Sequence, residues 1–279
     1  GEYTNDNILI AFVLSSFLIL VLGFIDDCYP LSATLKILVQ IVIVSSMVYF
    51  TGLKFETFGH SFGLTNQLSL GVFSYPITIL GIVFVTNAYN LMDGTDGVAS
   101  CLVLLAIMGI NIIDLPYGSF YLNTVSVALI GSLIPFLWFN VIKNSKNKIF
   151  LGDSGSLFLG YIIACFLLHQ TQINENLSPT YVLWIIAIPV FDVIAVMTYR
   201  LKKSHSLFTP DRKHLHHFLE SLGLSIRNII LVIIGLGLLF LLLGLLIEYN
   251  ARMLSFPILL LLLICYVWLR VFSKYSKFN

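Results

Sequence analysis

Apolar runs fill most of the chain, and short polar segments separate them. Because a helix needs about 20 mainly apolar residues to cross a membrane, these runs predict spanning helices. Reading each run between its polar breaks predicts about nine of them. Their expected ranges are 8–25, 33–50, 73–88, 98–113, 122–141, 157–168, 181–199, 229–247 and 254–272. We therefore expect an all-α polytopic membrane protein, in which residues 1–279 form a single membrane-embedded domain.

The basic residues are divided unequally between the two ends of the predicted helices. The loops and helix ends on one side hold 13 Lys and Arg residues, and those on the other side hold only Lys54 and Arg252, which together make the 15 in the chain. Because basic loops stay in the cytoplasm during membrane insertion, the first end is predicted to be cytoplasmic. The division also supports the number of helices, since one missed helix would mix the two groups.

The segment 51–71, on the predicted outer side, has a different pattern. Polar and aromatic side chains alternate in Lys54-Phe55-Glu56-Thr57-Phe58. A period of two places successive side chains on opposite faces of an extended chain. The pattern favours a short extracytoplasmic β-hairpin or surface strand.

Composition agrees with a membrane location and excludes other classes of protein. Of the residues, 58% are hydrophobic and 10% are charged, against about 25% charged in a soluble domain. So little polar surface cannot face water on all sides. The net charge of +1 gives no overall positive field that would attract nucleic acid. The four cysteines are scattered, which favours small apolar fillers over disulfides or zinc ligands.

Acidic residues gather at the predicted cytoplasmic end, where a carboxylate beside lipid is costly and usually has a function or a partner. They are Asp26, Asp27, Asp93, Asp96, Asp153, Asp192, Asp211 and Glu220. A single aspartate there would be an ordinary charge at the membrane interface. Three separate clusters on one face instead favour a functional site.

The first cluster is the pair Asp26-Asp27 at the end of the first predicted helix. Adjacent carboxylates repel each other, and water screens this repulsion poorly near a membrane. A divalent cation or a basic ligand would relieve it. The alternative interpretation is a polar stop after a membrane span, although a single aspartate would serve that purpose equally well.

The second cluster lies in segment 87–97, which links two predicted helices. Its two Asp-Gly steps are typical of tight turns. A turn needs only one such step, however. The two amides and two carboxylates of Asn87, Asn90, Asp93 and Asp96 make a better set of oxygen ligands for a hard cation such as magnesium.

The third cluster, segment 150–156, precedes another apolar run. Its glycines allow the backbone to come close to a ligand, and the free N–H groups at a helix start suit a phosphate. Alternatively, Asp153 or Ser154 serves as the N-cap of this helix. The two interpretations are compatible.

A cytoplasmic loop contains His214, His216 and His217 beside Arg212 and Lys213, which form a basic, titratable patch. Zinc ligands on a helix prefer a spacing of four residues and no cysteine lies nearby, so a pyrophosphate-binding loop is favoured over a metal site. With the carboxylates, this loop indicates phosphoryl transfer, in which charge neutralisation and positioning do most of the catalysis. A transporter or channel is the rival class, but its acids should line a path across the bilayer.

Several short motifs follow one another as they do in one known family. They are Asp26-Asp27, 87–97, Asn140, 150–156, 189–192 and 209–217. On these motifs the chain resembles the polyprenyl-phosphate N-acetylhexosamine-1-phosphate transferases over essentially its whole length. The loop 209–217 resembles the WecA-type members most. Members of this family have two further helices and a glycine-rich basic loop before the Asp-Asp helix, so we expect the chain to be N-terminally truncated.

The resemblance implies an enzyme that uses magnesium, with manganese as a substitute ion. Asp153 resembles the principal metal ligand and Asn90 a second one. Asp26 and Asp27 are similar to a catalytic acidic pair near the lipid phosphate. The resemblance places Asp93 and Asp96 among the catalytic residues around the nucleotide and the metal.

The resemblance also implies residues that bind the substrates. Phe150 is similar to an aromatic residue that stacks on uracil, and Asn87 and Asn140 resemble positions that line the site. The residues implied on the pyrophosphate and sugar side are Arg212, Lys213, His214, His216 and His217. Asp192 resembles a recurrent acid to which we assign no role.

The activity implied by the resemblance is transfer of N-acetylglucosamine 1-phosphate from UDP-N-acetylglucosamine to undecaprenyl phosphate, with release of UMP. This step initiates a lipid-linked glycan of the O-antigen, enterobacterial common antigen or teichoic acid type. Another UDP-N-acetylhexosamine is the alternative donor. We expect a multi-pass protein of the bacterial cytoplasmic (inner) membrane with its active site facing the cytoplasm, and we consider a homodimer as one arrangement.

Overall fold

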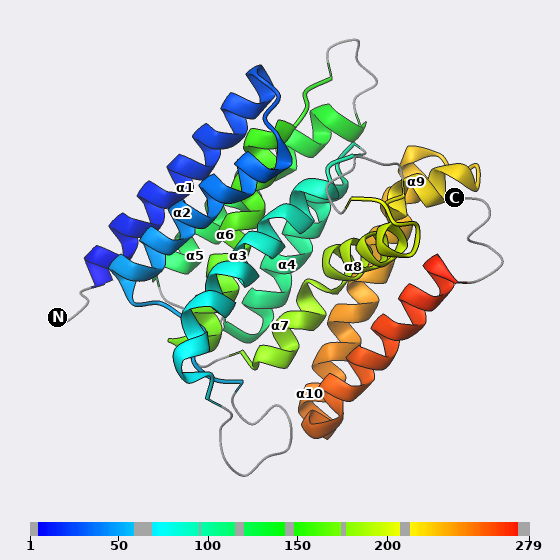
Figure 1. The fold of residues 1–279 in the computed structure, drawn as a ribbon. Coiled ribbons are helices and arrows are strands. Elements are labelled where there is room, and N and C mark those ends of the chain that lie inside the picture. The colour runs from blue at the N-terminus through cyan, green and yellow to red at the C-terminus, as the bar shows by residue number, and fades with distance from the viewer. Residues whose placement is uncertain are drawn as a thin grey trace.

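The computed structural model describes residues 5–58, 69–94, 96–114, 120–142, 148–173, 177–206 and 213–272. Long helices make up most of this part of the chain, as Figure 1 shows. The first half contains α1 (Asn5–Cys28), α2 (Ala33–Thr51), η1 (Gly71–Phe73), α3 (Ser74–Leu91), α4 (Val98–Asp114), α5 (Phe120–Leu137) and the π-helix η2 (Trp138–Ile142). The second half contains α6 (Gly152–Gln172), α7 (Pro179–Ile185), α8 (Ala187–Lys202), α9 (Leu215–Ser221) and α10 (Ile226–Val271).

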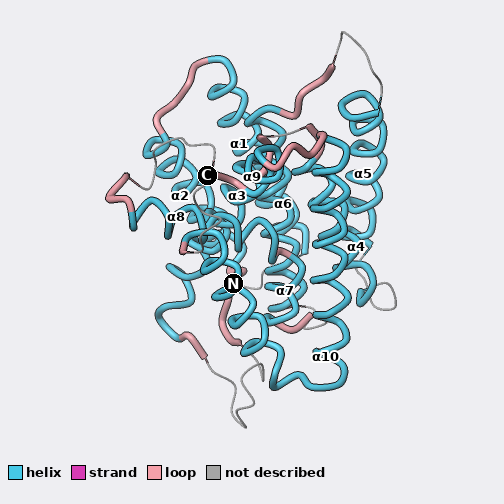
Figure 2. Tube along the Cα trace, turned by 90° about the vertical axis from the view of Figure 1, so that its right-hand side faces the viewer, coloured by secondary structure: helices cyan, strands magenta, loops and turns pink. Residues whose placement is uncertain are grey.

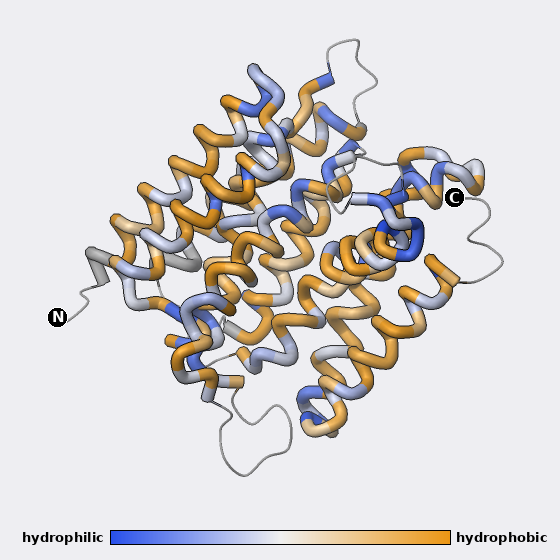
Figure 3. Tube along the Cα trace, viewed as in Figure 1, coloured by the Kyte–Doolittle hydropathy of each residue, from blue (hydrophilic) through white to orange (hydrophobic). Residues whose placement is uncertain are grey.

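The described helices form a bundle with no named strand, which confirms the predicted all-α class. Loops gather at the two ends of the bundle (Figure 2), and apolar positions fill the middle of the helices (Figure 3). In the predicted hairpin segment, Thr57 and Ser69 form an isolated antiparallel bridge. Residues 59–68 lie outside the described residues, so the hairpin itself stays a prediction.

Helical structure occurs at each of the predicted ranges, but the number of membrane spans stays a prediction. Among the described residues, six helices are long and apolar enough to cross a membrane, or seven if α7 and α8 form one span. The 46 residues of α10 would extend about 69 Å as one straight helix, more than twice a hydrocarbon core of about 30 Å. Non-helical backbone at Ala251 instead divides α10, and its two limbs lie side by side in Figure 1.

The prediction of one continuous helix over 181–199 is wrong. The chain bends by 78° between α7 and α8, and Ile186 at the bend has non-helical φ and ψ angles of −101° and 15°. The cause lies at Pro189. In an uninterrupted helix its ring would clash with the carbonyl of Ile185, and it has no N–H to continue the hydrogen bonding. A new helix start places Pro189 in the first turn of α8, where its missing N–H costs little.

The most buried of the candidate spans is α6. Within its most apolar stretch of 18 residues, 67% is buried. The corresponding share is 22–33% in the other five helices that are long and apolar enough to cross a membrane. It packs mainly against α1 and α3. Gly160 permits the contact with α3, because a Cβ atom at this position would lie 2.8 Å from the carbonyl oxygen of Thr86. Small residues allow this close approach of two helices within a membrane.

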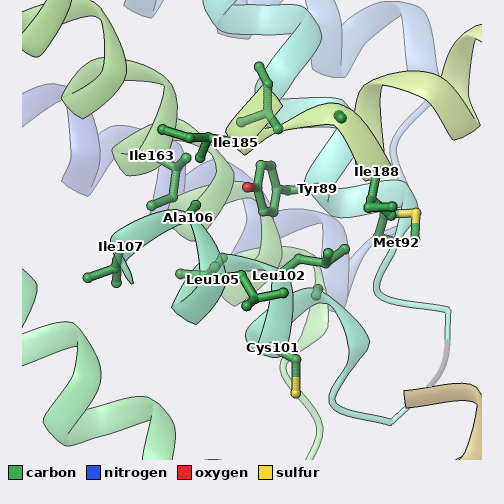
Figure 4. Packing of buried hydrophobic residues seen from close by; sticks show 14 of the residues in the cluster. Tyr89, Met92, Cys101, Leu102, Leu105, Ala106, Ile107, Ile163, Ile185 and Ile188 are labelled. Atoms are coloured by element: carbon green, nitrogen blue, oxygen red, sulfur yellow. The ribbon is translucent and has the colours of Figure 1, made fainter. Parts of the chain in front are cut away.

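A larger apolar core lies between α3, α4, α6 and the α7–α8 bend. Figure 4 shows Tyr89 of α3 at its centre, among Leu102 and Ala106 of α4, Ile163 of α6 and Ile185 of α7. These side chains are all buried. The core therefore holds the end of α3, and the turn that follows it, in a fixed position relative to α6.

Gly23 provides the first prediction, because it allows α1 to touch the start of α6. A Cβ atom at Gly23 would lie 2.4 Å from Cα of Ser154 and 2.5 Å from the carbonyl oxygen of Asp153. Both are backbone atoms, so Gly23→Ala should separate the helices and destabilise the protein by about 1–3 kcal/mol. Thermal unfolding in detergent measures this as a Tm lower by several degrees. The matched control is Gly235→Ala on α10, where the added Cβ meets nothing within 4 Å. Equal Tm values for the two variants would contradict the prediction.

Candidate active site

A polar cavity of about 890 Å³ opens at the end of the bundle where α1 ends and α6 and α10 begin. Most of the residues predicted for the site line it. They are Asp27, Asn90, Asp93, Asp96, Asn140, Phe150, Asp153, His214, His216 and His217. Segments far apart in sequence are thus brought together at one end of the molecule, as the clustering of acids and histidines predicts.

Asp27 caps the first turn of α6. Its Oδ1 accepts a hydrogen bond from the backbone N–H of Asp153 at 2.8 Å, and its Oδ2 accepts one from the N–H of Ser154 at 3.0 Å. The alternative prediction, that Asp153 or Ser154 is the N-cap, is wrong, since Leu151 occupies that position without a side-chain bond. Gly152 has φ +69°, and a Cβ there would lie 2.8 Å from Asp27 Oδ2. The Asp27 carboxylate therefore binds the free N–H groups at the start of α6, which would otherwise suit a phosphate.

Lys36 joins two of the acidic clusters. Its Nζ lies 2.7 Å from Oδ2 of Asp26 and 3.1 Å from Oδ2 of Asp153. Asp26 also accepts a hydrogen bond from the N–H of Leu31 at 2.6 Å, is buried, and does not line the cavity. A basic residue of the chain itself thus lies beside Asp26, whereas the sequence suggested a divalent cation or a basic ligand at the Asp26-Asp27 pair.

Asn90 fixes the other oxygen of Asp153. Its Nδ2 donates to Asp153 Oδ1 at 2.9 Å and to Ser156 Oγ at 2.8 Å. The described residues contain no group of three His, Cys, Asp or Glu side chains that could hold a metal ion by themselves. A cation in this cavity would therefore need oxygen atoms of a ligand or of water in addition to Asp153.

The turn after α3 carries Asp93 and Asp96. Burial, and then the nearby carboxylates of Asp153, Asp27 and Asp96, raise the pKa of Asp93 to about 7. Asp96 forms an ion pair with Lys148. Negative charge is therefore concentrated around Asp93, which favours a cation in this part of the cavity.

The three histidines lie close together at the start of α9. The ring of His216 stacks 6.0 Å from that of His214 and lies 4.2 Å from that of His217. His216 is buried, and neither of its ring nitrogens has a hydrogen-bond partner among the described residues. It packs against the turn after α3, since a Cβ at Gly94 would lie 2.3 Å from its Nε2. Burial, and then His217 and His214, lower the pKa of His216 to about 4, so it is neutral at pH 7.

Asn140 and Phe150 also line the cavity. Asn140 lies in the π-helix η2, a rare form that often marks a functional position. Its Nδ2 donates to the carbonyl oxygen of Ile149 at 2.6 Å, and its buried Oδ1 has no partner in the described part of the chain. Phe150, which follows Ile149, is 73% exposed, so its ring is free to stack on a flat ligand.

Some predicted residues lie elsewhere. Asn87 hydrogen-bonds Gln40 and does not line the cavity. Lys213 also lies outside the cavity lining, with its Nζ 5.5 Å from the centre of the Tyr199 ring. Arg212 lies outside the described residues, so its placement stays a prediction.

An apolar pocket of about 670 Å³ lies beside the polar cavity, between α2, α3 and α8. Asn87 and Phe84 are among its lining residues. The pocket and the cavity share Lys36, Asn90, Leu91, Arg200 and His214. Three of these five are basic or titratable groups, so the boundary between the apolar and the polar space can attract an anion.

Sequence reasoning missed Lys36, Arg200 and Gly94 as site residues. Lys36 had a usable signal, because it is the only charged residue in the predicted span 33–50 and charges within spans are usually functional. Arg200 and Gly94 gave no such signal. Arg200 resembles any basic residue at a cytoplasmic helix end, and Gly94 resembles any turn glycine until His216 is placed against it.

Comparison with known proteins supports the resemblance of the motifs. The sequence model of the family described as Glycosyl transferase family 4 matches residues 9–171. A Bacillus subtilis protein named probable undecaprenyl-phosphate N-acetylglucosaminyl 1-phosphate transferase is 36% identical over 265 residues, which cover 95% of this chain and 72% of the relative.

Relatives from other bacteria carry closely related names. The undecaprenyl-phosphate alpha-N-acetylglucosaminyl 1-phosphate transferase of Yersinia pestis is 34% identical over 77% of this chain and 60% of its own length. The protein of the same name from Escherichia coli K12 is 32% identical over 88% of this chain and 67% of its own length. The chain thus spans about 60–72% of the length of these relatives.

The neutral, buried state of His216 predicts a pH-dependent stability. Its pKa is about 4 in the folded protein and 6.5 ordinarily, so the unfolded chain binds more protons between these values. Stability should therefore rise from pH 4 to 6.5 and be lost as the pH falls through this window, by up to about 3 kcal/mol. We expect the Tm of His216→Gln to depend less on pH in this range. The control His205→Gln changes an exposed histidine and should keep the wild-type slope. Equal slopes for both variants would contradict the assignment.

Proposed function

Because the chain belongs to glycosyl transferase family 4, we propose that it transfers N-acetylglucosamine 1-phosphate from UDP-N-acetylglucosamine to undecaprenyl phosphate and releases UMP. The names of the relatives support both substrates. The observation that carries the proposal is the meeting of a polar cavity and an apolar pocket at Lys36, Arg200 and His214. A lipid phosphate has an apolar tail and a charged head, and this boundary provides a place for each.

The acceptor lipid occupies the apolar pocket with its phosphate at the boundary. The pocket lies between α2, α3 and α8 and is lined mainly by aliphatic and aromatic side chains. A phosphate that leaves water needs charged partners, because burying an unpaired charge is very costly. Lys36 and Arg200 supply positive charge, and His214 supplies a titratable ring.

The donor nucleotide sugar occupies the polar cavity, whose volume lies within the usual range of ligand sites. The exposed ring of Phe150 stacks on the uracil, and the buried Oδ1 of Asn140 accepts a hydrogen bond from it. The pyrophosphate and sugar lie toward the histidines of α9. Because His216 is neutral and its nitrogens are unpaired in the described structure, it suits contacts to neutral N–H or O–H groups.

In the reaction, an oxygen of the lipid phosphate attacks the phosphorus that carries the sugar. The bond from this phosphorus to the bridging oxygen breaks, and UMP leaves with the electron pair. The second pKa of a phosphate monoester is about 6, so the acceptor is mostly dianionic at neutral pH. A general base is therefore less important than orientation. The bonds already made by Asp26 and Asp27 agree with organising roles for these carboxylates.

Magnesium, with manganese as a substitute, fits the donor set of this cavity. Magnesium is usually held by one or two carboxylates together with substrate phosphates and water, and not by a protein cage. Asp153 would be the carboxylate ligand, with Asn90 offering its amide oxygen after a flip of the side chain. Burial and then the nearby carboxylates raise the pKa of Asp93, and a cation would offset the negative charge of those carboxylates. The bound ion supplies neutralisation of the pyrophosphate.

We place the protein in the bacterial cytoplasmic membrane with the cavity facing the cytoplasm. Lys36, Lys148 and Arg200 lie at the cavity end, whereas Lys54 and Arg252 pair with Glu56 and Glu248 elsewhere. The relatives are bacterial proteins. The nucleotide sugar, which is made in the cytoplasm, would then reach the site directly.

The proposal is tested with the full chain in lipid nanodiscs, UDP-N-acetylglucosamine, undecaprenyl phosphate and magnesium. We expect equal amounts of UMP and of lipid-linked sugar phosphate. UDP-N-acetylgalactosamine, offered alone and in competition, tests the alternative donor. Movement of the nucleotide sugar across liposomes without UMP release would support the rival class of transporter. Absence of any lipid-linked product would overturn the proposal.

Lys36 should bind the acceptor phosphate. A charge-assisted hydrogen bond contributes about 1.5–3 kcal/mol, so Lys36→Met should lower kcat/KM for undecaprenyl phosphate by roughly 10- to 100-fold. The effect on KM for the donor should be much smaller. Lys54→Met is the matched control, because Lys54 pairs with Glu56 and does not line either space. An equal loss for both substrates would argue against the assignment.

Removal of divalent ions should abolish transfer, and magnesium should restore it. Asp153→Asn replaces a negative ligand with a neutral one, so the magnesium concentration needed for half-maximal rate should rise by roughly 10-fold or more. UMP release measured over a magnesium titration gives this value. Full activity of the wild-type chain in excess chelator would exclude the metal from the proposal.

A further inference from the structure

Asp192 is a fully buried carboxylate in the second turn of α8, after the α7–α8 bend, and the mechanism above does not use it. Its side chain is 0% exposed. A buried carboxylate is costly unless hydrogen bonds and opposite charge compensate it. Asp192 therefore has a specific set of partners, and these identify its role.

The partners of Asp192 come from two further elements. Its Oδ2 lies 2.8 Å from Nδ1 of His214, and its Oδ1 accepts a hydrogen bond from the N–H of Leu215 at 2.9 Å. From the last turns of α10, the hydroxyl of Tyr266 donates to Oδ1 at 3.2 Å, and Nη2 of Arg270 lies 3.8 Å away. One carboxylate thus connects α8, the start of α9 and the end of α10.

This arrangement determines which nitrogen of His214 can meet a ligand. An ionised carboxylate only accepts hydrogen bonds, so Nδ1 must carry a proton. The nitrogen on the other side of the ring, Nε2, is left for the two spaces that His214 lines. In the neutral ring Nε2 accepts a hydrogen bond, and in the imidazolium form it donates one to a phosphate oxygen.

The backbone around His214 is held as firmly as its ring. Arg270 donates from Nη2 to the carbonyl oxygen of Lys213, and its guanidinium lies 4.6 Å from the centre of the Phe218 ring. Asp192 binds the N–H of Leu215 on the other side of the histidine. His214 is therefore fixed through its ring and through both neighbouring residues.

We propose that Asp192 is a positioning residue that fixes the tautomer and orientation of His214, so that Nε2 faces the phosphate at the boundary of the cavity and the apolar pocket. The role of the phosphate rests on the proposed function, whereas the Asp192–His214 pair does not. A purely structural role would need only the bond from Leu215, which an asparagine could also accept. The two roles therefore predict different behaviour for Asp192→Asn.

In Asp192→Asn, the amide oxygen can keep the bond from Leu215 while the amide nitrogen faces His214. This nitrogen donates, so Nδ1 must lose its proton and Nε2 must gain one. Selective ¹⁵N-histidine NMR of the full chain, with the signal of His214 assigned through His214→Gln, should show the proton on Nδ1 in the wild type and on Nε2 in the variant. If His214 had the same tautomer in both proteins, Asp192 would not determine it, and the proposed role of Asp192 would be overturned whether or not the chain is a transferase.

Kinetics then test whether the pair acts on transfer. Loss of a carboxylate that orients a functional histidine costs roughly 10- to 100-fold in activity in metal sites, and we expect a similar fall in kcat/KM for Asp192→Asn. The double variant with His214→Gln should be no worse than His214→Gln alone, because Asp192 acts through that ring. If the losses in kcat/KM of the two single variants multiplied in the double variant, the two residues would act independently and the proposal would be overturned.

Glu248→Gln provides the control for loss of a partly buried, hydrogen-bonded carboxylate outside the site. Glu248 also accepts from a hydroxyl, that of Ser178 at 2.7 Å, and pairs with Arg252, and it lines neither the cavity nor the apolar pocket. We expect this variant to have a lower Tm than the wild type but the same kcat/KM once activity is normalised to the amount of folded protein. If Glu248→Gln reduced kcat/KM as much as Asp192→Asn, the effect would be one of general stability and the proposal would fail.

Discussion

The contact between the end of α1 and the start of α6 is the constraint on which the rest of the site depends. Gly23 allows the two backbones to approach, and the carboxylate of Asp27 then accepts hydrogen bonds from the first N–H groups of α6. Negative charge at a helix N-terminus is stabilised by the helix dipole as well as by these bonds. These contacts hold Asp153 in the first turn of α6, where it lines the polar cavity. The rest of α6 is deeply buried.

The electrostatics of the cavity follow from that placement. Asp26, Asp27, Asp93 and Asp153 would repel one another without compensation, and Lys36 offsets part of the charge by pairing with Asp26 and Asp153. Burial, together with the carboxylates of Asp153, Asp27 and Asp96, raises the pKa of Asp93. A site with an excess of negative charge is suited to a cation and, through the cation, to a pyrophosphate. Lys36 and Arg200 supply positive charge where the cavity meets the apolar pocket, and a second phosphate can lie there.

The bend between α7 and α8 gives the site its second substrate space. A straight helix would have continued along the bundle, whereas α8 turns by 78° and forms a wall of the apolar pocket with α2 and α3. The same helix carries Asp192, which holds His214 at the boundary of that pocket. One local feature, Pro189 close to the bend, therefore contributes to both the shape of the pocket and the position of a polar group at its edge.

The sequence alone determined the class of fold, the approximate helices and the end of the molecule at which the chemistry lies. These follow from hydropathy and charge, which act on each segment nearly independently of the others. Most of the residues predicted from the motifs line the cavity, since short polar segments in an apolar chain have few other uses. The bend at Ile186 was missed because the hydropathy of a segment does not show whether its helix is straight or bent. Pro189 was nevertheless a visible signal.

Only the tertiary structure decided which groups are partners. Asp27 caps α6, Asp26 and Asp153 share Lys36, and Asp192 holds His214, and each pair joins residues on different elements. Likewise, the sequence grouped Asn87 and Lys213 with the site, but packing placed them outside the cavity lining. The physical reason is that a hydrogen bond or ion pair depends on distances of a few ångströms. Those distances are set by how helices approach one another, at positions such as Gly23 and Gly160, and not by the order of residues in any one segment.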